Sequence, residues 1–337
     1  MQIQNRKTPS RSLLGLILIL LLLPLAASAF GNRPEPRPLR ILLTNDDGFD
    51  SHGIEALHVA LKAAGHDVTI VAPATQQSGK GGSINTGVFD FTPGGGTMQL
   101  TFHGDGVWSL AGSPSDCVTT ALDVVMKDNP PDLIVSGLNE GQNVGRPGSN
   151  ASGTEGAALK GVFRGIPAIA GSMEVDFSES DDDFPSTVAS YAPSAEFIAR
   201  LIGRLQATRG RELLPAGAMM LNLNFPVPYS VVKGFKVTRL GPGSDIELPH
   251  FDPSQGFPSF GIPPIASFPA CAAVDEPGEF CFSTVGLGFS PSPDGVKDSE
   301  LDALRGDYIS ITPMSGDMTS GPPAGPLLEK RLRSLQP

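Results

Sequence analysis

The 337-residue sequence has little of what disulfide scaffolds, zinc proteins or nucleic-acid-binding proteins depend on. With only three cysteines, a hydrophobic core rather than a set of disulfides has to stabilise the fold. The cysteines and the five histidines form no cluster with zinc-ligand spacing. There are 24 lysines and arginines against 35 aspartates and glutamates, and the net charge of −11 provides no electrostatic basis for polynucleotide binding.

Long apolar runs are also missing, except near the N-terminus. There, three basic residues precede an apolar run at 13–25, and small residues around Ala29 follow it. This order is typical of a secretory signal peptide, which we expect to comprise residues 1–29 with cleavage after Ala29. A membrane anchor is the weaker interpretation, because the run is too short to span a bilayer comfortably. We therefore expect an exported protein, periplasmic or secreted, with no stable membrane span.

Up to about residue 240, the pattern alternates between buried strands and amphipathic helices. Strands are predicted at 40–45, 67–72, 132–137, 167–171, 219–225 and 235–240, and helices at 54–64, 113–126, 154–165 and 192–207. A last strand is predicted at 308–314, and a short charged helix from about residue 327. The alternation predicts an α/β fold: a three-layer αβα sandwich with a Rossmann-like, mostly parallel sheet.

Residues 241–297 differ from the rest in composition. Proline, glycine, serine and phenylalanine dominate, and helical periodicity disappears. We expect a lid or an oligomerisation arm with an extended, hairpin-like form; a disordered insert is the alternative. The predicted organisation is thus a signal peptide (1–29), a core (30–240), this excursion (241–297), and a final core strand with a C-terminal tail (298–337).

The three cysteines are expected to differ in state. Cys271 and Cys281 lie in the same excursion, so we expect them to pair in an oxidising compartment. Cys117 lies among apolar residues of a predicted helix and is expected to be a buried free thiol.

Oxygen-bearing side chains follow three of the predicted strands. Asp46 and Asp47 end the first strand, Ser78 lies in the glycine-rich loop after the second, and Asn139 ends the third. The carboxyl ends of parallel strands share one edge of an open sheet, where ligands bind. Carboxylate, hydroxyl and amide oxygens suit Mg²⁺, Mn²⁺ or Ca²⁺ better than zinc. The pattern therefore predicts a metal-assisted enzyme.

Taken singly, each motif also has an ordinary structural interpretation. Two aspartates and a glycine after a strand usually form a turn and a helix N-cap. Asn139 and Asn143 are common turn residues, and Ser152 or Thr154 would be a normal cap for the helix that follows them. The start of that helix is also a ready anion-binding site.

Together, these motifs resemble those of the SurE family. The resemblance is carried, in this order, by residues 43–48, 71–73 with 77–79, 112–117, 136–143, 152–154, 221–226 and 308–313. The Asn-Asp-Asp-Gly and Ser-Gly-x-Asn-x-Gly-x-Asn elements are specific to this family. It comprises metal-dependent phosphatases, among them 5′/3′-nucleotidases and, in some branches, acid phosphatases.

The resemblance implies a function for each motif. Asp46, Asp47, Ser78 and Asn139 would hold one divalent ion per subunit, Mg²⁺ or Mn²⁺, and the two aspartates would also be the catalytic residues. Phosphate and substrate would be bound by a further set: Asn45, Gly79, Asn143, Ser152, Gly153 and Thr154. The implied substrate is a nucleoside monophosphate, and the implied assembly is a homodimer or homotetramer.

The sequence departs from the family pattern in three places. Lys80-Gly-Gly82 stands where some relatives have a histidine, Glu155 stands where a small apolar residue is usual, and Lys160 stands where an acid is common. These departures bear on substrate choice more than on the reaction. Two alternatives to a nucleotidase stay open: an exported broad-specificity acid phosphatase, and a non-catalytic exported binding protein. A dinucleotide binder is disfavoured, because no G-x-G-x-x-G follows the first strand.

Overall fold

The computed structural model describes residues 37–85, 97–176, 178–179, 184–208, 212–216, 219–244 and 294–317. It also describes the backbone of four two-residue strands between 246 and 289, and positions 326 and 330. The predicted signal peptide, Cys271, Cys281 and most of the predicted C-terminal helix lie outside the described residues. Among the helices that are described, none is long and apolar enough to cross a membrane.

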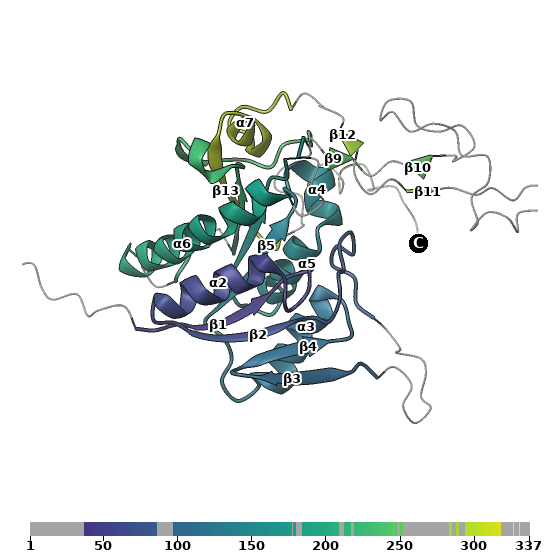
Figure 1. Cartoon of the computed structure of the whole chain (residues 1–337), viewed down its shortest axis with the longest axis vertical. Helices are drawn as coiled ribbons and strands as arrows, with labels where there is room; N and C mark the ends of the chain where they lie inside the picture. Colours follow the sequence, from purple (N-terminus) through teal and green to yellow (C-terminus); the bar gives the residue numbers. More distant parts are fainter. Residues whose placement is uncertain are drawn as a thin grey trace, which may run out of the picture. The chain divides into compact units, whose positions relative to one another are not determined.

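A nine-stranded, mostly parallel sheet forms the centre of the fold (Figure 1). In spatial order its strands are β3 (Leu100–Gly104), β4 (Val107–Leu110), β2 (Asp67–Pro73), β1 (Arg40–Thr44), β5 (Leu133–Glu140), β6 (Ala168–Met173), β7 (Met220–Phe225), β13 (Tyr308–Met314) and β8 (Gly234–Val237). Neighbouring strands are parallel except that β3 runs antiparallel to β4, and β13 runs antiparallel to β7. The chain order reverses at β1, which lies between β2 and β5. Such a reversal creates a crevice at the carboxyl ends of the strands.

Helices cover both faces of the sheet, which confirms the predicted three-layer sandwich (Figure 1). On one face, α2 (His52–Ala63) packs against α6 (Pro185–Thr208). On the other, α3 (Pro114–Thr120), continued by a π-helical turn (Ala121–Val125), packs against α5 (Gly153–Val162). Successive side chains of β1 point to opposite faces of the sheet, and so both helix layers have an apolar surface to pack on. Ile41 and Leu43 join the core under α2 and α6, whereas Leu42 joins the core under α3 and α5.

Each predicted core strand and helix has a counterpart in the structure, but several elements were not predicted. The β3–β4 hairpin, α4 (Gly145–Ala151), α7 (Glu300–Arg305) and a 3₁₀ turn (Tyr229–Val231) are all short, and α6 begins at Pro185 rather than near 192. The sequence of α4 contains two glycines and a proline, which have poor helix propensity, so no periodic pattern indicates a helix there. Leu301 and Leu304 of α7 bury against Val144, next to the start of α4.

The excursion contains two short antiparallel strand pairs. β9 (Ile246–Glu247) pairs with β12 (Gly288–Phe289), and β10 (His250–Phe251) pairs with β11 (Ser283–Thr284). The pairs are nested in the sequence, since β10 and β11 lie between β9 and β12. Its role as a lid or an oligomerisation arm stays a prediction.

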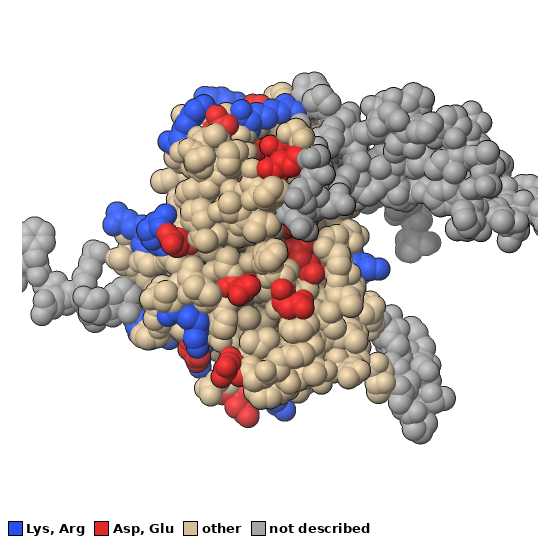
Figure 2. Space-filling model, viewed as in Figure 1, with Lys and Arg blue, Asp and Glu red and all other residues tan. Residues whose placement is uncertain are grey.

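Surface charge agrees with the acidic composition. On the face shown in Figure 2, aspartate and glutamate side chains lie in several groups across the middle, whereas lysine and arginine side chains gather mainly near the upper rim and the left side. No continuous basic surface of the kind that binds polynucleotides extends over the described residues on this face.

Candidate active site

Asp46 lies two residues after the end of β1, and its carboxylate is held by the first turn of α5. Thr154 Oγ1 donates a hydrogen bond of 2.6 Å to Asp46 Oδ1, and the backbone N–H groups of Gly153 and Thr154 also stabilise the carboxylate. The close approach requires glycine at position 153, since a Cβ there would lie 2.7 Å from Asp46 Oδ2. Asp46 is 2% exposed. The helix start therefore fixes the orientation of a buried carboxylate.

Asp47 connects the loop that follows β2 with the last residue of β5. Gln76 Nε2 donates to Asp47 Oδ1 over 3.0 Å, and the N–H of Glu140 donates to Asp47 Oδ2 over 3.2 Å. Gln76 was not among the predicted site residues. Its place between the end of β2 and Ser78 was the only sequence signal for this role.

Asn139 lies near the end of β5, where the strand is irregular. The register between β5 and β6 shifts between Ser136 and Asn139, and the peptide bond between Gly137 and Leu138 is cis. Asn139 Nδ2 donates to the carbonyl oxygen of Gly141 over 2.6 Å, which fixes the amide orientation. Asn139 Oδ1 is buried and accepts no hydrogen bond from the described part of the chain. That oxygen is thus available as a ligand.

Ser78 is linked to the two aspartates through its own loop. Its hydroxyl and its N–H both donate to Gln76 Oε1, over 3.0 and 2.8 Å. The N–H of Gln77 donates to the carbonyl oxygen of Asp46 over 2.7 Å. The structure therefore brings the Ser78 loop against the end of β1, as the strand-end argument predicts. The Ser78 hydroxyl retains lone pairs for a ligand, because it acts as a donor to Gln76.

Asn45 closes the turn that carries the aspartates. Its Nδ2 donates to the carbonyl oxygen of Gly48 and to Ser51 Oγ, each over 2.8 Å, and its Oδ1 accepts from the N–H of Gly48 over 3.3 Å. These three partners within the turn occupy the Asn45 side chain. Its role in substrate binding stays a prediction.

Protein partners also engage most of the predicted phosphate-binding side chains. Ser152 Oγ accepts from the N–H of Glu155 over 3.0 Å and so caps α5, while Thr154 binds Asp46. Asn143 Nδ2 donates to Ser172 Oγ over 2.9 Å. Gly79, in contrast, has a positive φ of 77° and open space around the position of a Cβ, so substrate can approach the backbone there.

The electrostatics of the two aspartates favour a bound cation. Burial raises the pKa of Asp46, and burial together with the Asp46 carboxylate raises the pKa of Asp47 to about 7. The groups that act most strongly on these two pKa values include no cationic side chain. A buried carboxylate and a half-buried one stand next to each other in the sequence, and Asn139 Oδ1 accepts no hydrogen bond from the described residues; such oxygens fit a hard divalent ion. Histidine, cysteine, aspartate and glutamate form no three-residue metal cluster in the described ranges.

Comparison with known proteins agrees with this arrangement. Residues 41–245 match the family described as Survival protein SurE. The chain belongs to the SurE family. It is 34% identical to a protein named 5′-nucleotidase SurE from Xylella fastidiosa over 284 residues, 83% of this chain and 91% of that one. It is 39% identical to a protein of the same name from Methanocella arvoryzae over 281 residues, 83% of this chain and 93% of that one. The crystal structure of the SurE protein from Aquifex aeolicus superposes with a TM-score of 0.59 at 26% identity, covering 88% of this chain and 98% of that one.

In this SurE family member, the Glu155 side chain is hydrogen-bonded to α4. It is fully buried, and its Oε1 accepts from Ser149 Oγ over 2.9 Å. Burial and the nearby Glu300 carboxyl raise the pKa of Glu155 to about 8. The raised pKa favours the neutral form of Glu155, which weakens the repulsion that a carboxylate at this helix start would exert on an anion.

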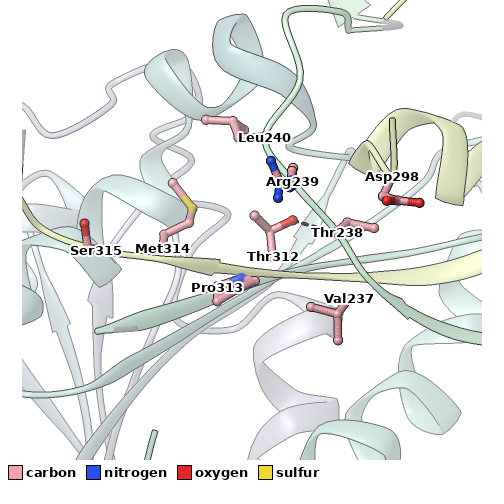
Figure 3. A pocket seen from close by; sticks show the side chains of 9 residues that line it. All are labelled: Val237, Thr238, Arg239, Leu240, Asp298, Thr312, Pro313, Met314 and Ser315. Carbon is pink, nitrogen blue, oxygen red and sulfur yellow. Dashed lines mark hydrogen bonds between the residues drawn. The ribbon is translucent and has the colours of Figure 1, made fainter. Parts of the chain in front are cut away.

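A cavity of about 580 Å³ lies between the end of β8 and the end of β13 (Figure 3). Its lining runs over residues 237–240, 298 and 312–315, and contains none of the predicted site residues. The two threonines in its wall, Thr238 and Thr312, share a hydrogen bond of 2.7 Å, drawn dashed in Figure 3. We assign no chemistry to this cavity.

Proposed function

We propose that this SurE family member is a divalent-metal-dependent phosphomonoesterase that hydrolyses nucleoside monophosphates to nucleoside and phosphate. Relatives that cover more than four fifths of the chain are named 5′-nucleotidases. The observation that carries the proposal is the hydrogen bond from the N–H of Glu140 to Asp47, which brings the end of β5, with Asn139, to the aspartates that follow β1. Asn139 Oδ1 accepts no hydrogen bond from the described residues. The carboxyl ends of the strands are the place in an open α/β sheet where ligands bind.

The metal-binding residues in this proposal are Asp46, Asp47, Ser78 and Asn139, and Mg²⁺ or Mn²⁺ is the ion that their oxygens suit. When bound, the ion would neutralise charge on the phosphate and lower the pKa of a coordinated water. The residues themselves prepare the site: α5 holds Asp46 rigid, and Gln76 connects Asp47 with Ser78.

Asp46 has a second role in this proposal, as the group that orients the attacking water or acts as base or nucleophile. Its orientation is fixed by the Thr154 hydroxyl and by the N–H groups at the start of α5. Gly79 and the loop beyond it give the phosphate access to backbone N–H groups. These preorganised donors stabilise charge as it develops.

A broad-specificity acid phosphatase is the second candidate. One observation favours it: burial raises the pKa values of Glu155 and Glu300, so these side chains favour the fold in acid. The non-catalytic alternative has less support, since the four oxygen ligands are all present.

A substrate panel tests the proposal. Mature protein is incubated with 5′-NMPs, 3′-NMPs, p-nitrophenyl phosphate and polyphosphate, with Mg²⁺, with Mn²⁺, or with EDTA, and phosphate release is measured. We expect release from nucleoside monophosphates with metal and none after chelation. Undiminished phosphate release after exhaustive chelation would contradict the metal-dependent mechanism. A clear preference for p-nitrophenyl phosphate at acid pH would favour the acid phosphatase.

We also propose that the mature protein is exported and begins after Ala29. The support is the order of basic, apolar and small residues at the N-terminus. Fractionation of expressing cells followed by N-terminal sequencing tests this directly. An intact N-terminus in the cytoplasmic fraction would contradict it.

A further inference from the structure

The segment that joins the end of β5 to the start of α4 is buried, which is unusual for a loop. All residues from Gly141 to Gly145 are buried, and Val144 has no exposed surface. Connecting segments normally lie on the surface, because water there supplies partners for their backbone N–H and C=O groups. In this 141–145 segment, protein groups have to supply those partners instead.

The segment also has little conformational preference of its own. Gly141 and Gly145, at its two ends, have positive φ values of 117° and 69°. Glycine loses more conformational freedom on folding than any other residue, so glycine at both ends does not fix the path of the chain. Contacts with other elements must therefore hold the segment in place.

The backbone of Asn143, in the middle of the segment, is held by two side chains of β7. Its N–H donates to Asn224 Oδ1 over 2.7 Å. Its carbonyl oxygen accepts from Asn222 Nδ2 over 2.9 Å and from Asn224 Nδ2 over 3.1 Å. Asn222 and Asn224 are fully buried and lie two positions apart on the strand, so both point to the same face of the sheet. One face of β7 thus presents two amides to a single residue of the segment.

Glu300, the first residue of α7, holds the end of the segment. Its Oε2 accepts from the N–H of Gly145 over 3.0 Å, and its Oε1 accepts from Asn222 Nδ2 over 3.1 Å. The Asn222 amide has two N–H donors, and it gives one to Glu300 and the other to Asn143. The Thr312 side chain also forms a hydrogen bond with Glu300. This buried carboxylate therefore fixes Gly145 directly and Asn143 through the Asn222 amide.

The other end of the segment reaches Asn139, a proposed metal ligand. The N–H of Gly141 donates to the carbonyl oxygen of Met173 over 3.1 Å, and its own carbonyl oxygen accepts from Asn139 Nδ2 over 2.6 Å. This bond engages the nitrogen of the Asn139 amide, whereas Oδ1 accepts no hydrogen bond from the described residues. The orientation of Asn139 therefore depends on where the 141–145 segment places the Gly141 carbonyl group.

We propose that Asn222, Asn224 and Glu300 are positioning residues for the metal site. They fix the 141–145 segment, and the segment fixes the Asn139 amide so that Oδ1 is presented to the ion. The three residues act through the segment and not by contact with the ion or the substrate. This inference rests on the proposed function, because it takes Asn139 to be a ligand of the ion that the reaction needs.

Metal affinity in the absence of substrate tests the inference. Glu300→Gln keeps the shape of the side chain, but it places an amide N–H group opposite the N–H of Gly145 or that of Asn222. Calorimetric titration with Mn²⁺ should give a Kd about 10-fold above that of the wild type, because a ligand is less well oriented. Asn224→Ala removes both bonds to Asn143 and should raise the Kd by about 10–100-fold.

Asp132→Asn is the matched control. It is also a change from carboxylate to amide, and Asp132 Oδ2 also accepts a backbone N–H, that of Arg40, over 2.9 Å. Asp132 precedes β5 and Arg40 begins β1, so this contact lies at the opposite, amino ends of the strands. The Mn²⁺ Kd of Asp132→Asn should equal that of the wild type. If Asn224→Ala does not fold, the comparison of Glu300→Gln with Asp132→Asn decides.

Hydrogen exchange followed by mass spectrometry gives a second readout, which needs no metal. In Glu300→Gln, peptides that cover the 141–145 segment should exchange faster than in the wild type, because local opening is easier. Peptides from β1 and β2 should exchange as in the wild type, and Asp132→Asn should leave the 141–145 segment unchanged. A Mn²⁺ Kd in Glu300→Gln equal to that of the wild type would overturn the inference and leave Glu300 a role in the fold alone.

Phosphate release separates this inference from the proposed function. If the wild type binds Mn²⁺ more tightly than Glu300→Gln does, but hydrolyses no nucleoside monophosphate, the proposed function fails and the positioning role stands. If the wild type hydrolyses nucleoside monophosphates only with metal, and Glu300→Gln binds Mn²⁺ as the wild type does, the positioning role fails alone.

Discussion

The Thr154 hydroxyl donates a 2.6 Å hydrogen bond to the Asp46 carboxylate and so joins the first turn of α5 to the end of β1. The two residues are 108 positions apart in the sequence. A short hydrogen bond to a charged group is among the stronger ones in proteins, and here it is supported by backbone N–H groups of the same helix start. The helix that the sequence suggests as a phosphate site thus also positions the Asp46 carboxylate, a proposed metal ligand.

We expect Thr154→Val to lower kcat/KM by about 10–100-fold, because a group that orients a metal ligand is lost while the side-chain shape is kept. The free energy of unfolding should fall by about 1–3 kcal/mol, measured by urea denaturation. Thr154→Ser, which keeps the hydroxyl, should restore most activity. Thr119→Val is the control, since that hydroxyl donates to the Ser115 carbonyl oxygen within α3. Full activity in Thr154→Val would contradict the positioning role.

Asp46→Asn should reduce phosphate release by more than about 100-fold, because a charged ligand becomes a neutral one. The fold should survive, and in EDTA the Tm should be equal to or higher than that of the wild type, since burial disfavours the Asp46 charge. Added Mn²⁺ should raise the Tm of the wild type but not of this variant. Asp67→Asn, at the exposed start of β2, should behave as the wild type in both measurements. Retained turnover would remove Asp46 from the mechanism.

Glu155→Gln should change how stability depends on pH. The pKa of Glu155 rises from 4.5 to about 8 on folding, so between these values the folded state binds more protons than the unfolded state. The contribution of this group to the free energy of unfolding is therefore most favourable below about pH 4.5. It is lost progressively as the pH rises toward 8, by at most about 1.4 kcal/mol per pH unit.

In Glu155→Gln that slope should be absent, so the Tm of the variant relative to wild type should increase between pH 5 and pH 8. Thermal unfolding across this range in a non-coordinating buffer measures it. Parallel Tm curves for the two proteins would show that Glu155 does not titrate in this way.

The cysteines should give one disulfide and one free thiol in the exported protein. Cys117 is free and fully buried, and burial raises its thiol pKa, so it should react with alkylating reagents only after unfolding. Cys271 and Cys281 should be linked to each other, because both lie in one excursion of an exported chain. Mass spectrometry of unreduced, alkylated protein measures both points. Three alkylated thiols under denaturing conditions would refute the pairing.

The excursion at 241–297 should shape substrate choice without supplying metal ligands. It carries Phe251, Phe257, Phe260, Phe268, Phe280, Phe282 and Phe289. Aromatic rings that stack on a base contribute about 1–3 kcal/mol each, so removing residues 252–282 should raise KM for nucleotides far more than for p-nitrophenyl phosphate. Light scattering on the same variant reports whether the segment also holds subunits together. Equal changes of KM on both substrates would count against the role in substrate choice.

Much of the fold, and the strand ends that carry the proposed metal-binding residues, follow from local sequence patterns. Apolar runs such as Ile41–Leu43 alternate with helical stripes, and this pattern fixes the layers. Because parallel strands end at one edge of the sheet, Asp46, Asp47 and Asn139 had to lie near one another once the strands were assigned. The short elements escaped prediction, because a helix such as α4, with glycines and a proline, is held by its neighbours rather than by its own propensity.

The tertiary structure alone decided which partner each polar side chain has. Thr154 could have been a simple cap, and Glu155 could have faced the phosphate. The docking of α5 against the end of β1 places the first on Asp46 and turns the second toward Ser149. Gln76 likewise gains its role only because the loop after β2 and the end of β5 meet at Asp47. A sequence pattern indicates which faces of an element are buried. Hydrogen-bond partners depend instead on the distances between elements that are far apart in the sequence, and local periodicity does not determine those distances.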